Sequence, residues 1–311
     1  MPTFNTVVAG VHDSETGFRT VEVAALQAAE AGNRLILVTA FRGMVRGRSG
    51  DEETTYQSED REAAERVLAR AAARCAEVGA SNVEIEAVPG EPVAVLVNAV
   101  KRHGADMLLV GNHGLSSIAG RLLGSVPSGV RKEARCDVLI AHTTTHEWRK
   151  LLSRRHHPRT SNYQRKIVVG VHNSPLSHRA QEKAAALCIE GGAKLILVGV
   201  RLPANMRELA YATDMLREDS YQAHDATFNR DAIAESLYEA EEHARELGVA
   251  DVDKVIAHGD PGPGVLRVTE EREADLLVVG NRHDHGRAER ALEWVTTRVS
   301  KHTATHLLLV D

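Results

Sequence analysis

Short apolar runs alternate along the chain with longer segments in which apolar residues recur every three or four positions. The run from Leu35 to Val38 is uninterrupted, which is typical of a strand buried on both faces of a parallel sheet. Residues 61–78 instead carry one apolar stripe at helical spacing, which predicts an amphipathic helix. In the first half of the chain, the predicted strands are 7–11, 35–38, 82–88, 106–110 and 136–142, and the predicted helices include 21–28, 61–78, 92–104 and 125–134. This alternation predicts an α/β fold in which an open five-stranded parallel sheet has helices on both faces.

The same pattern occurs twice. The segment TVVAGVHDS at 6–14 matches IVVGVHNS at 167–174, at an offset of 160 positions. The later segment 89–112 matches 258–281 at an offset of 169 positions, so the second copy has nine extra residues between its second and third strands. A repeat of this length predicts two related domains and a connector. The predicted boundaries are 1–145 for the first domain, 146–164 for the basic linker and 165–311 for the second domain.

Length and composition agree with two globular domains. The chain has 311 residues, enough for two domains of about 150 residues each. Hydrophobic residues make up 43% and the net charge is −5, which argues against a general nucleic-acid binder. Cys75, Cys136 and Cys188 are far apart, which favours reduced thiols over disulfides or a metal site. No apolar stretch approaches the ~20 residues that span a bilayer, and the first residues lack a signal-peptide pattern, so we expect a cytoplasmic protein.

Glycines cluster directly after the fourth predicted strand. Gly111 and Gly114 are followed by Gly124, and Ser125 comes next. In open parallel sheets, ligands bind beyond the carboxyl ends of the strands, where the strand order reverses. Glycines let the backbone present N–H groups to an anion, and the first N–H groups of a helix favour phosphate. These glycines could instead serve only a turn and a helix start, but the full set at this place favours a phosphate site.

On these residues the chain closely resembles the universal stress protein family, in its tandem two-domain form. Gly111, Gly114, Gly124 and Ser125 match the family's nucleotide signature, G-x2-G-x9-G-[ST], at every position. The resemblance implies two Rossmann-like domains of the adenine nucleotide alpha hydrolase type. It also implies that the first domain binds ATP, with Mg²⁺ accompanying the nucleotide; many members bind ATP and others do not. The implied nucleotide-binding residues are Gly10, Val11, His12, Asp13, Ala40, Gly111, Asn112, His113, Gly114, Gly124, Ser125 and Val126.

The resemblance is uneven after the first two strands. The family usually has an aspartate after the first strand, where this chain has His12, and Asp13 stands in place of the usual glycine. His12 could hydrogen-bond adenine, Asp13 could shift to do so, or His12 lies on the turn without touching a ligand. Asp13 is also the nearest candidate for a magnesium ligand. Ala40 matches a position at which the family contacts adenine through its backbone.

The second domain lacks the phosphate signature. Alignment from Gly280 places His283, Glu293 and Trp294 at the remaining three positions. A carboxylate repels phosphate and a tryptophan fills the space that phosphate needs, so we expect this domain not to bind ATP in the same way. The metal-ligand residue types within 283–285 lie too close in sequence, without a distant fourth ligand, to favour a metal site.

The predicted site suits a regulatory nucleotide-binding protein better than a fast enzyme. The chain has no G-x4-G-K-[ST] loop and no evident pair of carboxylates for two metal ions, so any ATP hydrolysis should be slow. Two alternatives stay open. One is a stress scaffold that holds no nucleotide, and the other is an ATP-pyrophosphatase-type enzyme, for which AGVHDS at 9–14 is a faint match.

Two further segments bear on partners. Residues 146–166 carry seven Lys or Arg against one Glu, which favours a solvated connector over a docking site for an acidic partner or membrane surface. Residues 41–60 lack periodicity and favour a surface loop over a lid that brings arginines onto phosphates. The resemblance implies that strands 136–142 and 306–311 lie side by side as an intrachain pair. A homodimer of two chains and an unidentified regulatory protein are further expected partners.

Overall fold

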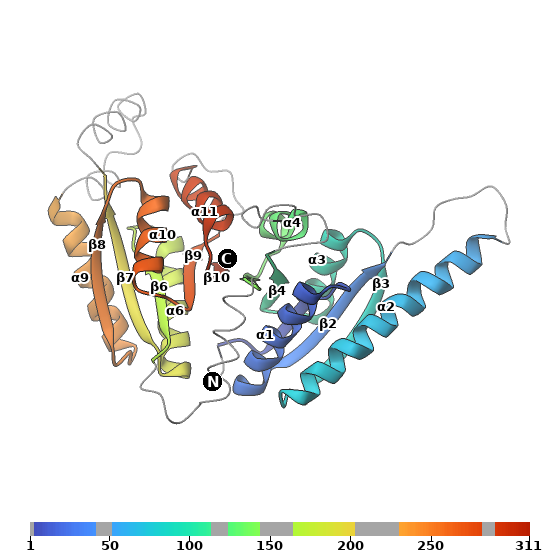
Figure 1. Ribbon diagram of the computed structural model, residues 1–311. Helices are drawn as coiled ribbons and strands as arrows, with labels where there is room; N and C mark the ends of the chain where they lie inside the picture. Colours follow the sequence, from blue (N-terminus) through green and yellow to red (C-terminus); the bar gives the residue numbers. More distant parts are fainter. Residues whose placement is uncertain (1–2, 42–51, 113–123, 144–163, 203–229, 282–289) are drawn as a thin grey trace. The chain divides into compact units, whose positions relative to one another are not determined.

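The computed structural model describes residues 3–41, 52–112, 124–143, 164–202, 230–281 and 290–311. The chain divides into two compact units, Met1–Pro158 and Arg159–Asp311 (Figure 1). In the described residues each unit contains one five-stranded parallel sheet. Most of the predicted linker lies outside these residues. No helix in the described part of the chain is both long and apolar enough to cross a membrane.

The first unit alternates strands and helices as the hydrophobic pattern predicts. Its strand order is β3-β2-β1-β4-β5, so the chain moves outward from β1 in one direction and then returns to start β4 on the other side of β1. The order of the strands therefore reverses between β1 and β4. The elements are β1 (Thr6–Gly10), α1 (Glu15–Ala31), β2 (Arg34–Phe41), α2 (Glu52–Glu77), β3 (Val83–Pro89), α3 (Pro92–His103), β4 (Met107–Gly111), α4 (Ser125–Glu133) and β5 (Asp137–Ala141).

The second unit repeats this arrangement, with the order β8-β7-β6-β9-β10. Strands β2 and β7 begin 160 residues apart and β3 and β8 begin 169 residues apart, which confirms that the nine extra residues fall between the second and third strands. The elements are β6 (Lys166–Gly170), α6 (Pro175–Gly191), β7 (Lys194–Arg201), α9 (Arg230–Glu246), β8 (Val252–His258), α10 (Pro261–Glu271), β9 (Leu276–Gly280), α11 (Arg290–His302) and β10 (His306–Val310).

Helices cover both faces of the sheet, as the uninterrupted apolar strands require. Gly199 and Val200 are successive residues of β7, and successive side chains of a strand point to opposite faces. A Cβ at Gly199 would lie 2.8 Å from Ile233 on α9, whereas Val200 Cγ1 lies 3.0 Å from the place of a Cβ at Gly264 on α10. Helices α9 and α10 therefore pack on opposite faces.

Helix boundaries follow local capping chemistry. Ser14 begins α1 because its hydroxyl accepts the N–H of Gly17 at 3.0 Å, which satisfies one of the donors that a first turn leaves open. Gly32 ends the same helix with φ at 72°, a conformation that a glycine adopts without steric cost. Ser174 begins α6 in the same way as Ser14 begins α1.

Helix α2 starts earlier than its apolar stripe predicts. The stripe indicates a helix over 61–78 and a surface loop over 41–60, but α2 begins at Glu52. Figure 1 shows the first turns of α2 extending past the strands of its unit. An apolar stripe indicates where a helix has a buried face, and it does not indicate where the helix begins.

Candidate functional site

The strand reversal between β1 and β4 lies at the carboxyl ends of these strands. Strands β1 and β4 pair in parallel through Val8 and Leu108, and β1 ends at Gly10 while β4 ends at Gly111. Three chain segments emerge at this edge: the turn into α1, the end of β2 and the connection into α4. A crevice at such a reversal is where open α/β sheets bind ligands.

The end of β2 offers backbone groups to this edge. In a strand, the N–H and C=O groups of alternate residues face alternate neighbours. The carbonyl of Val38 accepts the N–H of Val11 on the β1 side at 2.8 Å, while the carbonyl of Phe41 accepts the N–H of Gly90 on the β3 side at 2.9 Å. The N–H and C=O of Ala40 therefore face the β1 side, beyond the point where β1 ends. This geometry suits the backbone contact that the sequence predicts for Ala40.

Gly10 and Val11, the first two predicted site residues, make contacts within the protein. A Cβ at Gly10 would lie 3.1 Å from Leu96 on α3, so the glycine allows that helix to pack closely. Val11 is buried, its N–H is bonded to Val38, and its carbonyl accepts the hydroxyl of Thr39 at 3.1 Å. Both residues therefore position the turn and have few groups left for a ligand.

His12 is folded back onto the start of α1. Its Nδ1 lies 2.8 Å from the hydroxyl of Ser14, the residue that caps this helix. Its carbonyl oxygen comes so close to α1 that a Cβ at Gly17 would lie 2.3 Å from it. The second unit has Ser177 at the position of Gly17, and its hydroxyl accepts the N–H of His172 at 2.9 Å instead. The two turns are therefore built differently, although both carry a histidine.

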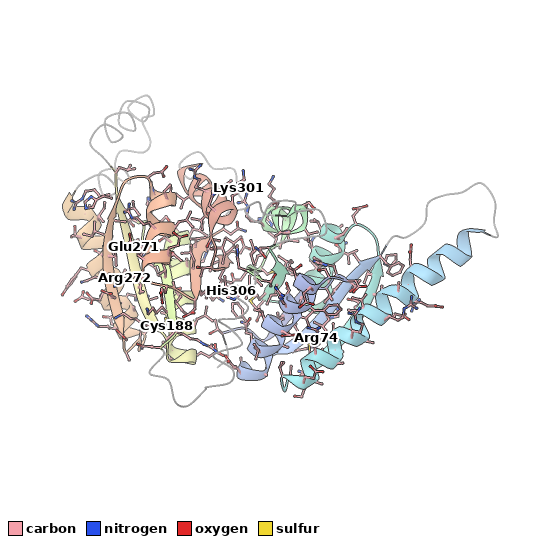
Figure 2. The ribbon with its side chains drawn as sticks, in the orientation of Figure 1. Arg74, Cys188, Glu271, Arg272, Lys301 and His306 are labelled. Atoms are coloured by element: carbon pink, nitrogen blue, oxygen red, sulfur yellow. The ribbon has the colours of Figure 1, made fainter. Side chains whose placement is uncertain are left out.

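Asp13 faces α2. Its carboxylate accepts a hydrogen bond from Arg70 at 3.0 Å, and the Arg70 guanidinium lies 4.4 Å from the centre of the Phe18 ring. Arg74, one turn further along α2, binds Glu22 at 2.7 Å (Figure 2). The bond to Arg70 uses Oδ1 of Asp13, and the positive charge of Arg70 disfavours a cation at the same carboxylate. In the part of the chain that the structure describes, no group of three His, Cys, Asp or Glu side chains is arranged for a metal ion.

The connection from β4 to α4 begins and ends at one point. The carbonyl of Asn112 accepts the N–H of Gly124 at 3.1 Å, so the two ends of the glycine motif lie side by side. His113 and Gly114, in contrast, lie outside the described residues. The structure therefore brings Gly111 and Asn112 next to Gly124 and Ser125, and it does not describe the loop between them.

The start of α4 presents free backbone donors. Gly124 is the N-cap, with φ −62° and no capping side chain, and Ser125 is exposed. The first N–H groups of an α-helix have no acceptor within their own helix. At the third helical position Pro127 has no N–H, so the open donors are those of Ser125 and Val126. Together with the helix dipole, these donors would favour an anion at this helix end.

Asn112 anchors the end of β4, next to the start of α4, to the end of β5. Only 3% of the residue is exposed, and its amide nitrogen lies 3.1 Å from Nδ1 of His142, just beyond β5. Its amide oxygen lies 3.4 Å from the N–H of Thr143, and its own N–H donates to Ala141 at 2.9 Å. The side chain is therefore directed into the protein. Sequence reasoning placed Asn112 in the site, but it gave no sign that this side chain anchors β4 to β5.

The second unit lacks the corresponding helix end. In the repeat, Glu293 and Trp294 correspond to Gly124 and Ser125. Helix α11 already runs from Arg290, so Glu293 and Trp294 are its fourth and fifth residues. The N–H of a fifth helical residue donates to the first residue's carbonyl. The N–H groups that are open at the start of α4 therefore correspond, in α11, to N–H groups that donate within the helix.

Comparisons with known proteins identify the family. The model of the universal stress protein family matches residues 3–142 and again 164–311. The universal stress protein Rv1636 of Mycobacterium tuberculosis is 42% identical over 147 residues, which are 46% of this chain and all of that relative. YxiE of Bacillus subtilis is 29% identical over 150 residues, 47% of this chain and 97% of that relative.

A solved structure that matches the whole chain agrees on the fold. A universal stress protein from Archaeoglobus fulgidus covers 100% of this chain and 97% of its own, with a TM-score of 0.67 and 19% identity. A universal stress protein solved in complex with cAMP covers 45% of this chain and 98% of its own, with 38% identity and a TM-score of 0.35. The chain therefore belongs to the universal stress protein family and carries two family domains in tandem.

Proposed function

We propose that the first domain binds ATP at the carboxyl edge of its sheet and that occupancy regulates the protein. The observation that supports this most directly is the start of α4, where Ser125 and Val126 present free N–H groups. They lie beside the strand reversal, because Gly124 is bonded to Asn112 directly after β4. Phosphate is the ligand group that such a helix end favours.

The groups at this edge fit the two ends of a nucleotide. The backbone of Ala40 faces the gap beyond β1 and suits the edge of an adenine ring, which carries both donors and acceptors. The N–H groups at the start of α4 suit the phosphates. Gly124 has no side chain to obstruct the approach, and its φ of −62° would also admit other residues, so backbone strain does not explain the glycine there.

Slow hydrolysis or none is the expected chemistry. Asp13, the carboxylate closest to the turn after β1, is bound to Arg70. A fast phosphoryl-transfer site needs positioned metal ions and a group that orients the attacking water. When Mg²⁺ is present it would accompany the phosphates of ATP, and Asp13 is the side chain proposed to reach it.

Nucleotide binding would then act on the protein by mass action. A ligand that binds one conformation stabilises that conformation by a free energy that grows with the logarithm of its free concentration relative to Kd. A regulatory partner protein would recognise the nucleotide-bound conformation.

Calorimetry with the purified full chain tests the proposal. ATP, AMP and cAMP are titrated separately, with and without Mg²⁺; cAMP is included because it was the ligand of the solved stress protein described above. We expect one ATP site per chain and slower hydrogen exchange in residues 107–112 and 125–133 when ATP is bound. The absence of binding by all three nucleotides, with no adenine in the purified protein by mass spectrometry, would favour the scaffold without nucleotide.

The pyrophosphatase-type alternative and the expected pairing of domains and chains need separate tests. Release of pyrophosphate from ATP with an acceptor substrate would favour the pyrophosphatase-type alternative. Pairing of the two domains through their fifth strands, and of two chains in a homodimer, stays a prediction from the family. Light scattering distinguishes one chain from two.

A further inference from the structure

A leucine side chain covers the end of β9 in the second domain. Gly280 is the last residue of β9 and Leu176 is the second residue of α6. A Cβ at Gly280 would lie 2.4 Å from Cγ of Leu176, 2.9 Å from its Cδ2 and 3.2 Å from its carbonyl oxygen. Only 9% of Leu176 is exposed. The leucine therefore packs directly against the backbone at the carboxyl end of β9.

This end of β9 is the place where a nucleotide would enter. Strand β9 pairs with β6, and the strand order of this domain reverses between them, as it does between β1 and β4 in the first domain. Gly280 corresponds to Gly111, the first glycine of the nucleotide signature. The carbonyl of Gly280 also accepts the hydroxyl of Thr296 on α11 at 2.9 Å.

The first domain has a smaller residue at the position of Leu176. At the offset of 160, Leu176 corresponds to Thr16 in the first turn of α1. Thr16 is partly exposed and its hydroxyl lies 3.0 Å from that of Ser14. The side chain is shorter than leucine and is directed to the polar cap of α1, whereas Leu176 is directed to the strand end. The residue that corresponds to Thr296 is Pro127, which has no hydroxyl to place over the strand end.

We propose that the second residue of the first helix decides which domain can take a nucleotide. Leu176 fills the space beyond Gly280 with the protein's own side chain, whereas the first domain has the shorter Thr16, directed to the cap of α1, at the corresponding position. This inference rests on the proposed function of the first domain. It adds a specificity-determining position outside the glycine signature, and it explains closure of the second site by volume, separately from the charge of Glu293.

Three variants of the full chain test the inference. Thr16→Leu introduces the second domain's residue, and calorimetry should show ATP affinity reduced by at least about tenfold, which corresponds to about 1.4 kcal/mol. Thr16→Val has the shape of threonine without its hydroxyl, and its affinity should stay within about threefold of the wild type because volume is the proposed cause. Thr16→Met fills the same space with a flexible chain and should also lose affinity. It replaces the leucine variant if that variant does not fold, as judged by circular dichroism.

The outcomes separate this inference from the proposed function. Wild-type binding with undiminished affinity in Thr16→Leu would overturn the inference and leave the nucleotide site of the first domain standing. Equal losses in Thr16→Leu and Thr16→Val would also overturn it, because the hydroxyl would then matter and not the volume. Hydrogen exchange in residues 276–281 that slows on addition of ATP would contradict a filled second site. If the wild type binds no nucleotide, the proposed function and this inference are both wrong.

Discussion

Replacement of Asn112 by alanine tests how the glycine motif is supported. The Asn112 side chain is buried between β4 and β5, with its amide nitrogen 3.1 Å from Nδ1 of His142 and its amide oxygen 3.4 Å from the N–H of Thr143. Asn112→Ala removes both bonds but keeps the backbone carbonyl that holds Gly124. The substitution therefore loosens the base of the site without altering any group that faces the predicted nucleotide.

The magnitude follows from these two bonds. Loss of a hydrogen bond that leaves a buried partner unsatisfied costs about 1–3 kcal/mol, and a long bond of 3.4 Å adds at most about 1 kcal/mol. We therefore expect Asn112→Ala to lower the free energy of unfolding by about 1–4 kcal/mol. Natural domains have about 5–15 kcal/mol in total, so the variant should still fold. ATP affinity should fall with it, because the start of α4 is held less firmly.

Urea unfolding followed by circular dichroism measures the loss, and hydrogen exchange locates it. Faster exchange is expected in residues 107–112 and 137–143. Asn281→Ala is the matched control, because Asn281 occupies the corresponding buried position of the second domain, with 1% exposed. It should destabilise its own domain and leave ATP affinity unchanged. A loss below about 0.5 kcal/mol in Asn112→Ala, the range of ordinary surface substitutions, would refute the buried network.

Three further substitutions or treatments test the packing. Among the described residues, neither side-chain amide atom of the buried Asn33 has a hydrogen-bond partner, and the second domain has Ala193 at this position. Asn33→Ala should therefore raise the free energy of unfolding by about 1 kcal/mol in urea titrations, and a loss of stability would contradict this. A Cβ at Gly129 would lie 2.6 Å from Val93 Cγ2, so Gly129→Ala should push α4 away from α3. The free energy of unfolding should fall by about 1–3 kcal/mol in the same urea titration. An unchanged urea midpoint would exclude this close approach of the two helices. Burial raises the pKa of the Cys75 thiol to about 12, so iodoacetamide at pH 8 should modify it in urea but not in the native protein. Because this pKa exceeds the unfolded value of 9.0, its contribution to stability is complete below pH 9 and is lost as the pH rises toward 12.

The strands and the glycine motif could be predicted because their signals are local. Four consecutive apolar residues, as in Leu35 to Val38, indicate a doubly buried strand without knowledge of what covers it. The glycines around Gly111 likewise show where the backbone must approach something closely. The tandem arrangement followed from the repeat alone.

The remaining features depend on contacts between segments that are distant in sequence. Asp13 meets Arg70 across 57 positions, and the sequence does not state that α2 passes beside the turn after β1. Leu176 is an ordinary apolar residue of a helix in the sequence, and its role depends on the packing of that helix against Gly280. The early start of α2 was missed because the apolar stripe that predicts this helix begins only at about residue 61. These outcomes reflect tertiary placement, which local patterns do not encode.

Calorimetry of ATP binding to the wild type, Gly124→Ala and Gly124→Glu tests the central claim most directly. Alanine is compatible with the φ of −62° at Gly124 and adds one methyl group, whereas glutamate places the second domain's carboxylate beside the free N–H groups of Ser125 and Val126. The account predicts one ATP per wild-type chain, a modest loss in Gly124→Ala and a loss of at least about 100-fold, about 2.7 kcal/mol, in Gly124→Glu. Equal binding by all three proteins would show that the nucleotide does not lie at the start of α4 and would contradict the account.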